Sequence, residues 1–221
     1  PQFNILDVKN NKGIDDKILV ISVDVSADRV IISYNGNVFL RQNDKSLELN
    51  FEQILQLQYD RGQRYFEDEV VQLSSIDDID DRLIDDYKKI LNIDELSSEE
   101  VLKARNLMIN GKLTNAGLLL FGKNPSKFLP QARLRVIKYS GMYQKVGTEI
   151  NIIKEKTFDK AIPNIIREAR EFINTQLRDF QYLDKDGKFK IMPEYPEFAW
   201  FEGIVNALTH RNYAIRGEHI K

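Results

Sequence analysis

The stretch Leu113-Thr-Asn-Ala-Gly-Leu-Leu-Leu-Phe-Gly122 is a very apolar run and the starting point for reading the fold. Thr114 is a residue type that caps helix N-termini, and Gly122 stands where a glycine commonly ends a helix. A short, buried helix is therefore predicted between them. The Asn115-Ala116-Gly117 segment lacks the spacing of a phosphate-binding loop, so its small residues are interpreted as a close-packing surface.

Two further helices are predicted on the amino-terminal side of this run. Apolar residues recur at helical spacing over residues 75–92, and Ser97 or Ser98 can cap a helix over 99–109 that Asn110-Gly111 would close. Six aspartates between residues 77 and 86 fall on the other face of the first of these helices. They do not have the spacing of a calcium-binding loop, and we interpret them as solvated surface.

The first 50 residues have the alternation and turn signals of β-structure. Strands are predicted over 3–8 and 17–25 around a turn at residues 10–13, and a hairpin joins 29–34 to 38–41 over Asn35-Gly36. A helix follows from the cap Asn50, with Gln53 three residues later, to about Arg61.

The carboxyl-terminal half alternates between the two kinds of element. Strands are predicted over 131–139, 148–156 and 188–192, a long helix over 158–182 with Pro163 in its first turn, and a last helix from Pro196 to Thr209 or Arg211. The predicted fold class is mixed α+β. A small β-rich unit with one helix occupies residues 1–70, and a helical and mixed α/β unit occupies 71–221.

Composition excludes several kinds of site. The chain of 221 residues has no cysteine, which excludes disulfides, thiolate zinc sites and a cysteine nucleophile. Its two histidines, His210 and His219, leave little for a metal centre, and no metal site is predicted. No apolar stretch is long enough to span a bilayer, so we expect a cytoplasmic protein without a membrane partner. Because the chain begins at Pro1 in a strand-like run, we interpret it as part of a longer protein.

The first unit resembles the second half of the Schlafen AlbA-type DNA-binding domain. The resemblance rests on Lys17-Ile-Leu-Val-Ile-Ser-Val23, Val38-Phe-Leu-Arg41 and Phe51-Glu-Gln-Ile54 with Leu57. It implies a nucleic-acid partner, DNA more readily than RNA. In Schlafen-type nucleases the catalytic carboxylates belong largely to the first half, upstream of Pro1, and no nuclease site is carried over.

The second unit resembles the region that follows this domain in bacterial proteins classed as transcriptional regulators or relatives of a RecG-type helicase. Its two signatures are the 113–122 run and Phe201-Glu-Gly-Ile-Val-Asn-Ala-Leu-Thr-His-Arg-Asn-Tyr213. The family pattern has an aspartate where this chain has Asn212. His210 and Arg211 are candidate functional residues, although a cation at a helix C-terminus is also favoured by the helix dipole.

Glu202 and Asn206 lie four residues apart, which places both on one face of a helix. The pair resembles the first box of the gyrase, chaperone, histidine-kinase and mismatch-repair ATPases, in which the glutamate activates water and the asparagine binds magnesium. That fold also needs a glycine-rich box, which would follow Lys221. The resemblance therefore implies ATP and magnesium for the parent protein and no cofactor for this truncated ATPase-like region. The alternative is that Glu202 faces solvent and Asn206 forms local hydrogen bonds.

The predicted nucleic-acid face combines Arg41, Arg61 and Arg64 with Tyr65, because arginines bind phosphates and exposed aromatic rings stack on bases. Scattered surface charge and core aromatics are the alternative interpretation. Arg133, Arg135 and Lys138 form a second basic candidate.

Three functions follow from these patterns. The favoured one is a DNA-binding, transcriptional-regulator-like protein that is non-catalytic in this chain. The alternatives are an ATP-binding or ATP-hydrolysing regulator with Glu202 as its catalytic group, and a Schlafen-type ribonuclease that lacks its catalytic half. The net charge of −2 argues against strong sequence-independent binding of nucleic acid.

A homodimer is a further expectation, because most soluble oligomers are symmetric homo-oligomers.

Overall fold

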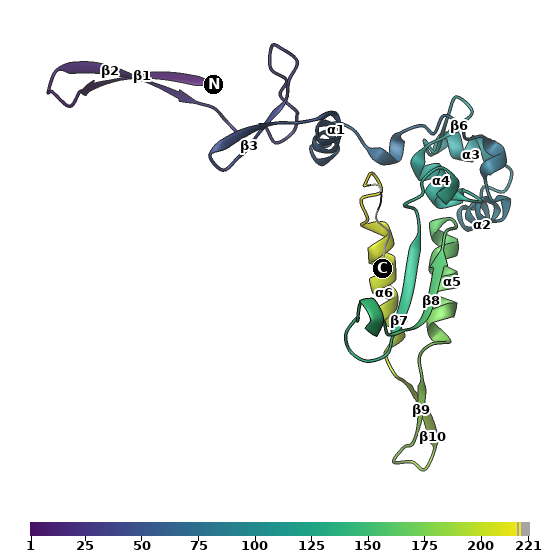
Figure 1. Ribbon diagram of the computed structural model, residues 1–221. Helices are drawn as coiled ribbons and strands as arrows, with labels where there is room; N and C mark the ends of the chain where they lie inside the picture. The colour runs from purple at the N-terminus through teal and green to yellow at the C-terminus, as the bar shows by residue number, and fades with distance from the viewer. Residues whose placement is uncertain (216, 218–221) are drawn as a thin grey trace. The chain divides into compact units, whose positions relative to one another are not determined.

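Six α-helices and ten short strands form the part of the chain that the computed structural model describes, residues 1–215 and 217 (Figure 1). The strands of this part pair as five antiparallel two-stranded sheets. The predicted mixed α+β class is therefore confirmed. The chain divides into two compact units, Pro1–Tyr65 and Phe66–Lys221, so residues 66–70 lie in the second unit rather than the first.

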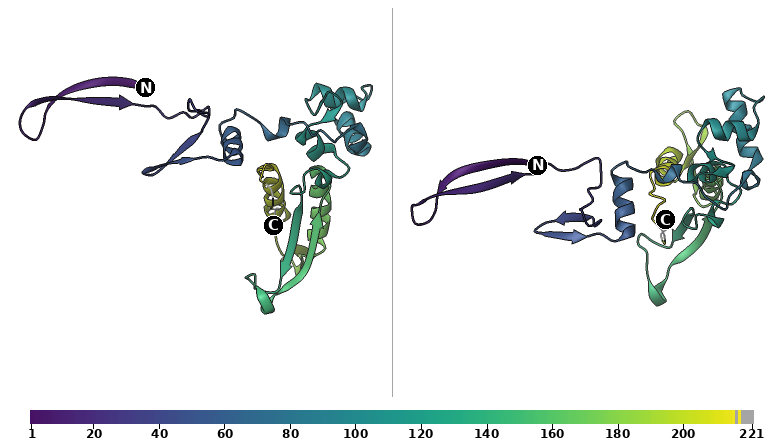
Figure 2. Two further views of the ribbon diagram at one scale, coloured as in Figure 1. Left: turned by 45° about the horizontal axis from the view of Figure 1, so that its top comes forward. Right: turned by 90° about the horizontal axis from the view of Figure 1, so that it is seen from above.

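The first unit begins with a long hairpin. Strands β1 (Gln2–Lys9) and β2 (Asp15–Ser22) pair in the register that places Ile5 opposite Leu19. The predicted turn is confirmed, because the amide of Gly13, at φ +79°, donates to the carbonyl of Asn10 over 2.8 Å. Both views in Figure 2 show β1–β2 (purple) as a two-stranded ribbon.

The predicted hairpin between 29–34 and 38–41 is wrong in its pairing. The turn at Asn35-Gly36 is present, but only an isolated bridge joins Ile32 to Val38. Strand β3 (Phe39–Gln42) instead pairs with β4 (Lys45–Glu48), where Leu40 faces Leu47 across the ladder. Two apolar side chains opposite each other stabilise this pairing.

Helix α1 (Phe51–Asp60) begins as predicted. The side chain of Asn50 accepts from the amide of Gln53, and the side chain of Gln53 accepts from the amide of Asn50. This capping box satisfies two amides that the helix itself leaves without partners.

In the second unit, the helix predicted over 75–92 is divided in two. Ser75 caps a short 3₁₀ turn, Ile76–Asp78, and Asp80 caps α2 (Asp81–Leu91). Two side chains that each bond a nearby amide favour two separate starts over one continuous helix.

The helix predicted over 99–109 also ends early. Helix α3 (Ser98–Ala104) is capped by Ser97, as predicted, but Met108–Ile109 is strand β5 and pairs with β6 (Lys112–Leu113). Asn110 and Gly111 have φ values of 50° and 75° and form the two-residue turn between these strands. The Asn-Gly pair is a hairpin turn here and not the end of a helix.

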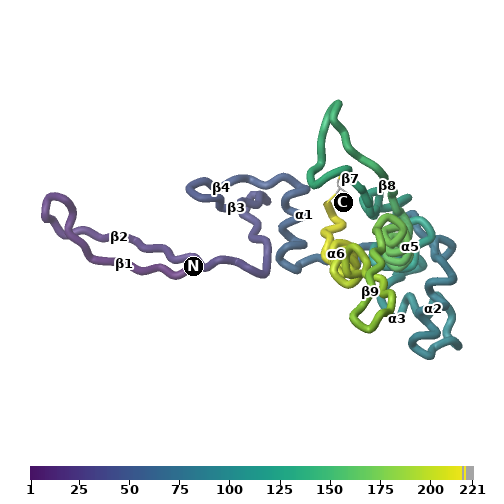
Figure 3. Tube along the Cα trace, turned by 90° about the horizontal axis from the view of Figure 1, so that it is seen from below, coloured from purple at the N-terminus to yellow at the C-terminus, as the bar shows by residue number. Residues whose placement is uncertain are grey.

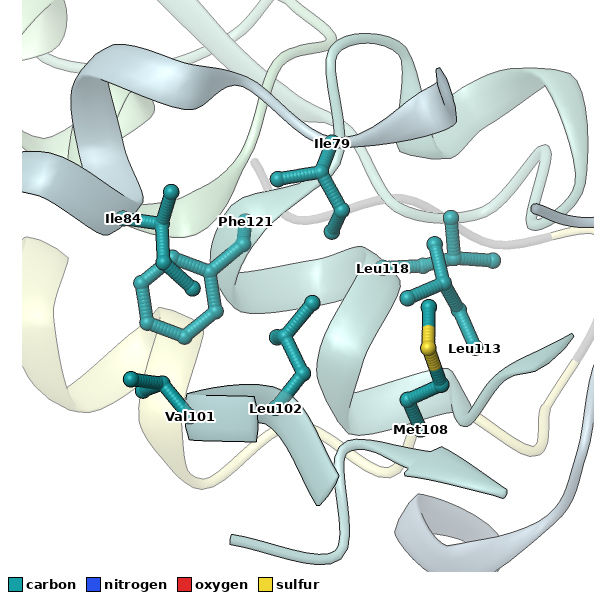
Figure 4. Close-up of a cluster of buried hydrophobic side chains, with 8 residues drawn as sticks. All are labelled: Ile79, Ile84, Val101, Leu102, Met108, Leu113, Leu118 and Phe121. Carbon is teal, nitrogen blue, oxygen red and sulfur yellow. The ribbon is translucent and has the colours of Figure 1, made fainter. Parts of the chain in front are cut away.

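Helix α4 (Asn115–Phe121) confirms the prediction for the apolar run, with Thr114 as N-cap and Gly122 as C-cap. It is the centre of the first hydrophobic core, and Figure 4 shows the side chains of this core pointing toward one another. The buried members are Ile79, Ile84, Val101, Leu102, Met108, Leu113, Leu118 and Phe121. Each large apolar side chain buried in this way contributes about 1.5–3 kcal/mol.

The rest of the second unit is built around the hairpin of β7 (Leu134–Tyr139) and β8 (Ile152–Phe158). Helices α5 (Ile162–Asn174) and α6 (Glu197–Thr209) lie side by side along it (Figures 1 and 3). Residues from all four elements form a second core. Its buried members are Leu134, Phe158, Ile165, Ala169 and Leu208.

The long helix predicted over 158–182 is too long at both ends. Helix α5 begins at Ile162, with Pro163 in its first turn, and ends at Asn174. The chain then enters the hairpin of β9 (Asp179–Leu183) and β10 (Phe189–Pro193). Phe180 and Tyr182 alternate with polar residues, and this alternation is the strand period rather than the helix period.

The remaining regular elements are three 3₁₀ turns at Phe66–Asp68, Pro125–Lys127 and Gly147–Glu149. Among the described residues, none of the helices has both the length and the apolar character needed to cross a membrane.

Candidate nucleic-acid interface

The end of α1 binds an upstream segment of the first unit. Arg61 is the C-cap residue of α1, and its guanidinium donates a hydrogen bond to the carbonyl of Arg29. Two residues later, Oε1 of Gln63 accepts from the amide of Val30 over 2.7 Å. These contacts hold residues 29–30 against the end of the helix, although more than 30 positions separate the two segments in sequence.

The contact brings three arginines to one part of the first unit. Arg29 and Arg64 have exposed side chains, and Arg61, which donates to the carbonyl of Arg29, is half-buried. Tyr65 follows directly and is 61% exposed, so its ring is accessible for stacking. The chain turns at Gly62, which has φ +65°, a conformation that favours glycine.

Arg29 is not among the residues that the sequence predicts. It stands at the start of the segment that is predicted as a hairpin strand, and only the folded chain brings it to Arg61. We name Arg29, Arg61, Arg64 and Tyr65 the arginine cluster.

Acidic residues moderate the charge around this cluster. Asp28 Oδ1 lies 3.8 Å from Arg29 Nε, and Asp60 accepts a hydrogen bond from Gln56 over 2.8 Å. The first unit has eight Lys and Arg residues against nine Asp and Glu residues. An attraction for phosphate would therefore come from the local arrangement of the arginines and not from the net charge of the unit.

Arg41 has a different setting from the other predicted arginines. It is exposed on β3, and its Nε donates to the carbonyl of Asn43 within the same hairpin over 3.0 Å. The structure places Arg41 on the β3–β4 hairpin, whereas Arg61 and Arg64 follow α1.

The second basic candidate contains an arginine that is already paired. Arg135 on β7 donates two hydrogen bonds, of 2.6 and 2.7 Å, to the carboxylate of Glu155 on β8. The hydrogen bonds to Glu155 raise the pKa of Arg135 above its ordinary value. Lys138 donates to the carbonyl of Gln176, and Arg133 precedes the strand. Binding of phosphate at Arg135 would have to displace Glu155.

Glu202 and Asn206 are both exposed and lie one turn apart on α6. Ile204 and Leu208 of the same helix contribute to the second core. The carbonyl of Asn206 accepts from the amide of His210 over 3.0 Å, which is an ordinary helical hydrogen bond at the C-terminus. Across residues 1–215 and 217, no three His, Asp or Glu side chains are grouped as a metal site.

The residues after α6 are held by packing. His210 is the exposed C-cap, and the guanidinium of Arg211 lies 5.5 Å from the ring centre of Tyr213. Tyr213 is only 6% exposed, and its hydroxyl donates to the carbonyl of Leu208 over 2.8 Å. Burial raises the pKa of Tyr213 to about 12. His219, the other histidine, lies outside the described residues.

Comparisons with known proteins give a partial family match and a likeness of fold. Residues 55–135 match the family described as a domain of unknown function, DUF8451. No curated protein matches the chain. A crystal structure of the DIP2311 protein from Corynebacterium diphtheriae has a TM-score of 0.51 and 17% sequence identity over 98% of this chain. The aligned region is 41% of that protein, so the chain spans less than half of the neighbour it is similar to, and the likeness is one of fold.

Proposed function

We propose that this chain is a nucleic-acid-binding module of a transcriptional-regulator-like protein and that the arginine cluster contacts the phosphate backbone, in DNA more readily than in RNA. The supporting observation is the contact between Arg61 and Arg29, which gathers arginines from two distant segments next to an exposed tyrosine. Guanidinium groups bind phosphate through two parallel hydrogen bonds, and a tyrosine ring can stack on an unpaired base.

The acidic neighbours set the expected strength of this binding. Since Asp28 and Asp60 flank the cluster and the unit has no basic excess, binding should be weak at physiological salt and should rise steeply as salt is lowered. Each phosphate contact adds about 0.9 to the slope of log affinity against log salt for duplex DNA, and about 0.7 for a single strand.

The test is fluorescence anisotropy of labelled duplex DNA and structured RNA across a salt series. Arg29→Gln removes a charge from an exposed side chain, and it should weaken binding and reduce the salt slope by about 1. Arg105→Gln is the matched control, because Arg105 is an exposed arginine at the C-cap of α3 in the other unit. Equal loss in both variants, or no binding to either nucleic acid at low salt, would reject the proposal.

The alternative of an ATP-dependent regulator is favoured by one observation, the exposure of Glu202 and Asn206 on the same side of α6. In that case, a longer protein would bind ATP in the presence of magnesium, and Asn206→Ala would abolish the magnesium dependence. Equal ATP binding with and without magnesium would exclude this role for Asn206.

A further inference from the structure

A cleft of about 540 Å³ lies in the second unit, where the first turns of α2 face the amino-terminal half of α5. Most of the side chains around it are charged. Those that matter for binding are Asp80, Arg82, Asp86, Lys123, Asn164 and Arg167. They come from three segments far apart in sequence, and none of them is a site residue that the sequence predicts.

Asn164 fixes the centre of this cleft. It is 7% exposed, and both ends of its side-chain amide are used. Its Nδ2 donates to Oδ2 of Asp80 over 3.3 Å, and its Oδ1 accepts from a guanidinium nitrogen of Arg167 over 2.7 Å. Asp80 in turn accepts from the amide of Arg82 over 3.1 Å as the cap of α2. The buried amide of Asn164 therefore orients Arg167 at the wall of the cleft. Through Asp80, it also links this wall to α2, which carries Arg82.

The charges around the cleft do not all cancel. Lys160 and Glu168 form an ion pair at 2.6 Å and neutralise each other. Lys123 Nζ donates to the carbonyl of Asp77 over 2.8 Å and has further hydrogens to donate. In the described part of the chain, neither Arg82 nor Asp86 has an ion pair. Three cations, Arg82, Lys123 and Arg167, thus face two carboxylates, of which Asp80 is already committed to hydrogen bonds.

We infer that this cleft binds a small phosphorylated molecule that bears hydroxyl groups, such as a sugar phosphate or a nucleotide. The two guanidinium groups and the ammonium group would bind the phosphate, because arginine forks match its oxygens and the charges are opposite. Asp86 accepts hydrogen bonds from hydroxyl groups. The volume lies within the range of small-molecule sites and exceeds what a phosphate ion alone would fill. The site involves the second unit only, so it is independent of the proposed nucleic-acid contact.

The test is isothermal titration calorimetry of the whole chain with ribose 5-phosphate, inorganic phosphate and ribose as probes. Ribose 5-phosphate is expected to bind more tightly than phosphate, and ribose is expected not to bind. Arg82→Gln and Arg167→Gln should each weaken ribose 5-phosphate binding about tenfold or more, which is the usual effect of losing a charged hydrogen bond. Arg105→Gln, outside the cleft, should leave the affinity unchanged.

Two outcomes of the calorimetry would overturn the inference. One is the absence of ribose 5-phosphate binding, and the other is binding that persists unchanged in both cleft variants. A further titration measures the binding of a single-stranded oligonucleotide to the wild-type chain and to the same two variants. If Arg82→Gln and Arg167→Gln weaken the oligonucleotide while the sugar phosphate does not bind, the phosphate recognised is that of nucleic acid, and the small-molecule site is rejected. Thermal unfolding of both variants checks that they fold. Since both arginine side chains are exposed, neither substitution is expected to unfold the chain, and each variant tests binding by itself.

Discussion

At the scale of single residues, the segment at the end of α6 contains one residue whose packing is well defined. In His210-Arg211-Asn212-Tyr213, Tyr213 has a plain structural role. Its hydroxyl bonds the carbonyl of Leu208, and its own carbonyl accepts from Gln131 over 2.6 Å. The segment is thus tied both to the helix that precedes it and to the chain before β7. His210 and Asn212 are exposed, and Arg211 is half-buried.

Tyr213 makes stability depend on pH in the alkaline range. Its pKa is about 12 in the folded chain, against 10.0 for the ordinary group, because burial disfavours the phenolate. The protonated form is therefore favoured by folding, and its stabilisation is complete below about pH 10. This stabilisation, up to about 3 kcal/mol for so large a difference in pKa, is lost as the pH rises toward 12.

Tyr213→Phe should reveal this dependence. At pH 8 the variant should be less stable by about 1 kcal/mol, because the carbonyl of Leu208 loses its donor. Between pH 10 and 12 the wild-type chain should lose its advantage, and the variant should become the more stable of the two. Urea unfolding of both proteins across this range measures the difference. Parallel pH curves for the two proteins would contradict the assignment.

The arginines show the limit of reading a site residue by residue. Arg61, Arg64 and Tyr65 could be proposed from sequence because they are close together along the chain. Arg29 could not, since its place depends on the hydrogen bond that its own carbonyl accepts from Arg61 and on the one that the next amide donates to Gln63, both of which lie more than 30 positions away. The same holds for Asn164, whose hydrogen bond to Asp80 spans 84 residues, and for Arg167, which Asn164 orients. Long-range hydrogen bonds have no local signature in sequence.

At the scale of elements, three capped helix starts were predictable, whereas the ends of α3 and α5 were not. Asn50, Ser97 and Thr114 act as caps in the structure, because capping depends on residues within three positions. The ends of α3 and α5 depend instead on hairpins that follow them. Asn110-Gly111 is compatible both with a helix end and with a hairpin turn, and the pairing of Met108 with Leu113 decides between the two.

The two interior glycines of the helices give opposite predictions. A Cβ on Gly117 of α4 would clash with the backbone carbonyl of Leu107, whereas nothing lies within 4 Å of a Cβ on Gly203 of α6. The predicted packing role of the Asn115-Ala116-Gly117 segment is confirmed at Gly117 by this close approach. A backbone neighbour cannot move aside as a flexible side chain can.

Gly117→Ala should therefore destabilise the second unit by about 1–3 kcal/mol, the usual range for overpacking. Gly203→Ala should stabilise it by about 0.5–1 kcal/mol, because alanine loses less backbone freedom in a helix. Chemical denaturation of the two variants, followed by circular dichroism, measures both changes. The same sign for both substitutions would show that the close approach to Leu107 has no energetic effect.

At the scale of the whole molecule, the two units differ in how much apolar surface they bury. The second unit has extended hydrophobic cores around α4 and between α5 and the β7–β8 hairpin. In the first unit, only Val30 and Val38 are buried hydrophobic residues among those described. The β1–β2 hairpin has exposed apolar side chains on both faces, including Phe3, Leu6 and Leu19. Strands with two apolar faces are typical of strands covered on both sides.

This contrast predicts two levels of protection from hydrogen exchange in this chain. A two-stranded hairpin is marginally stable in water, so the amides of β1 and β2 should exchange with opening free energies near zero. Amides of α4 and α5 should exchange only by opening of the second unit, since both helices are packed in its cores. Exchange followed by mass spectrometry on peptides covering 2–22, 115–121 and 162–174 distinguishes the two levels.

Matched leucine substitutions link this protection to burial. Leu102 is fully buried, and Leu102→Ala should cost about 2–5 kcal/mol and lower protection throughout α4. Leu19 is 57% exposed, and Leu19→Ala should leave the protection of α4 unchanged. If the hairpin amides were instead as protected as those of α4, the apolar faces of β1–β2 would have to be covered in solution. The loss of stability caused by Leu19→Ala would then approach the loss caused by Leu102→Ala. A dependence of the hairpin's protection on protein concentration would identify a second copy of the chain as the cover.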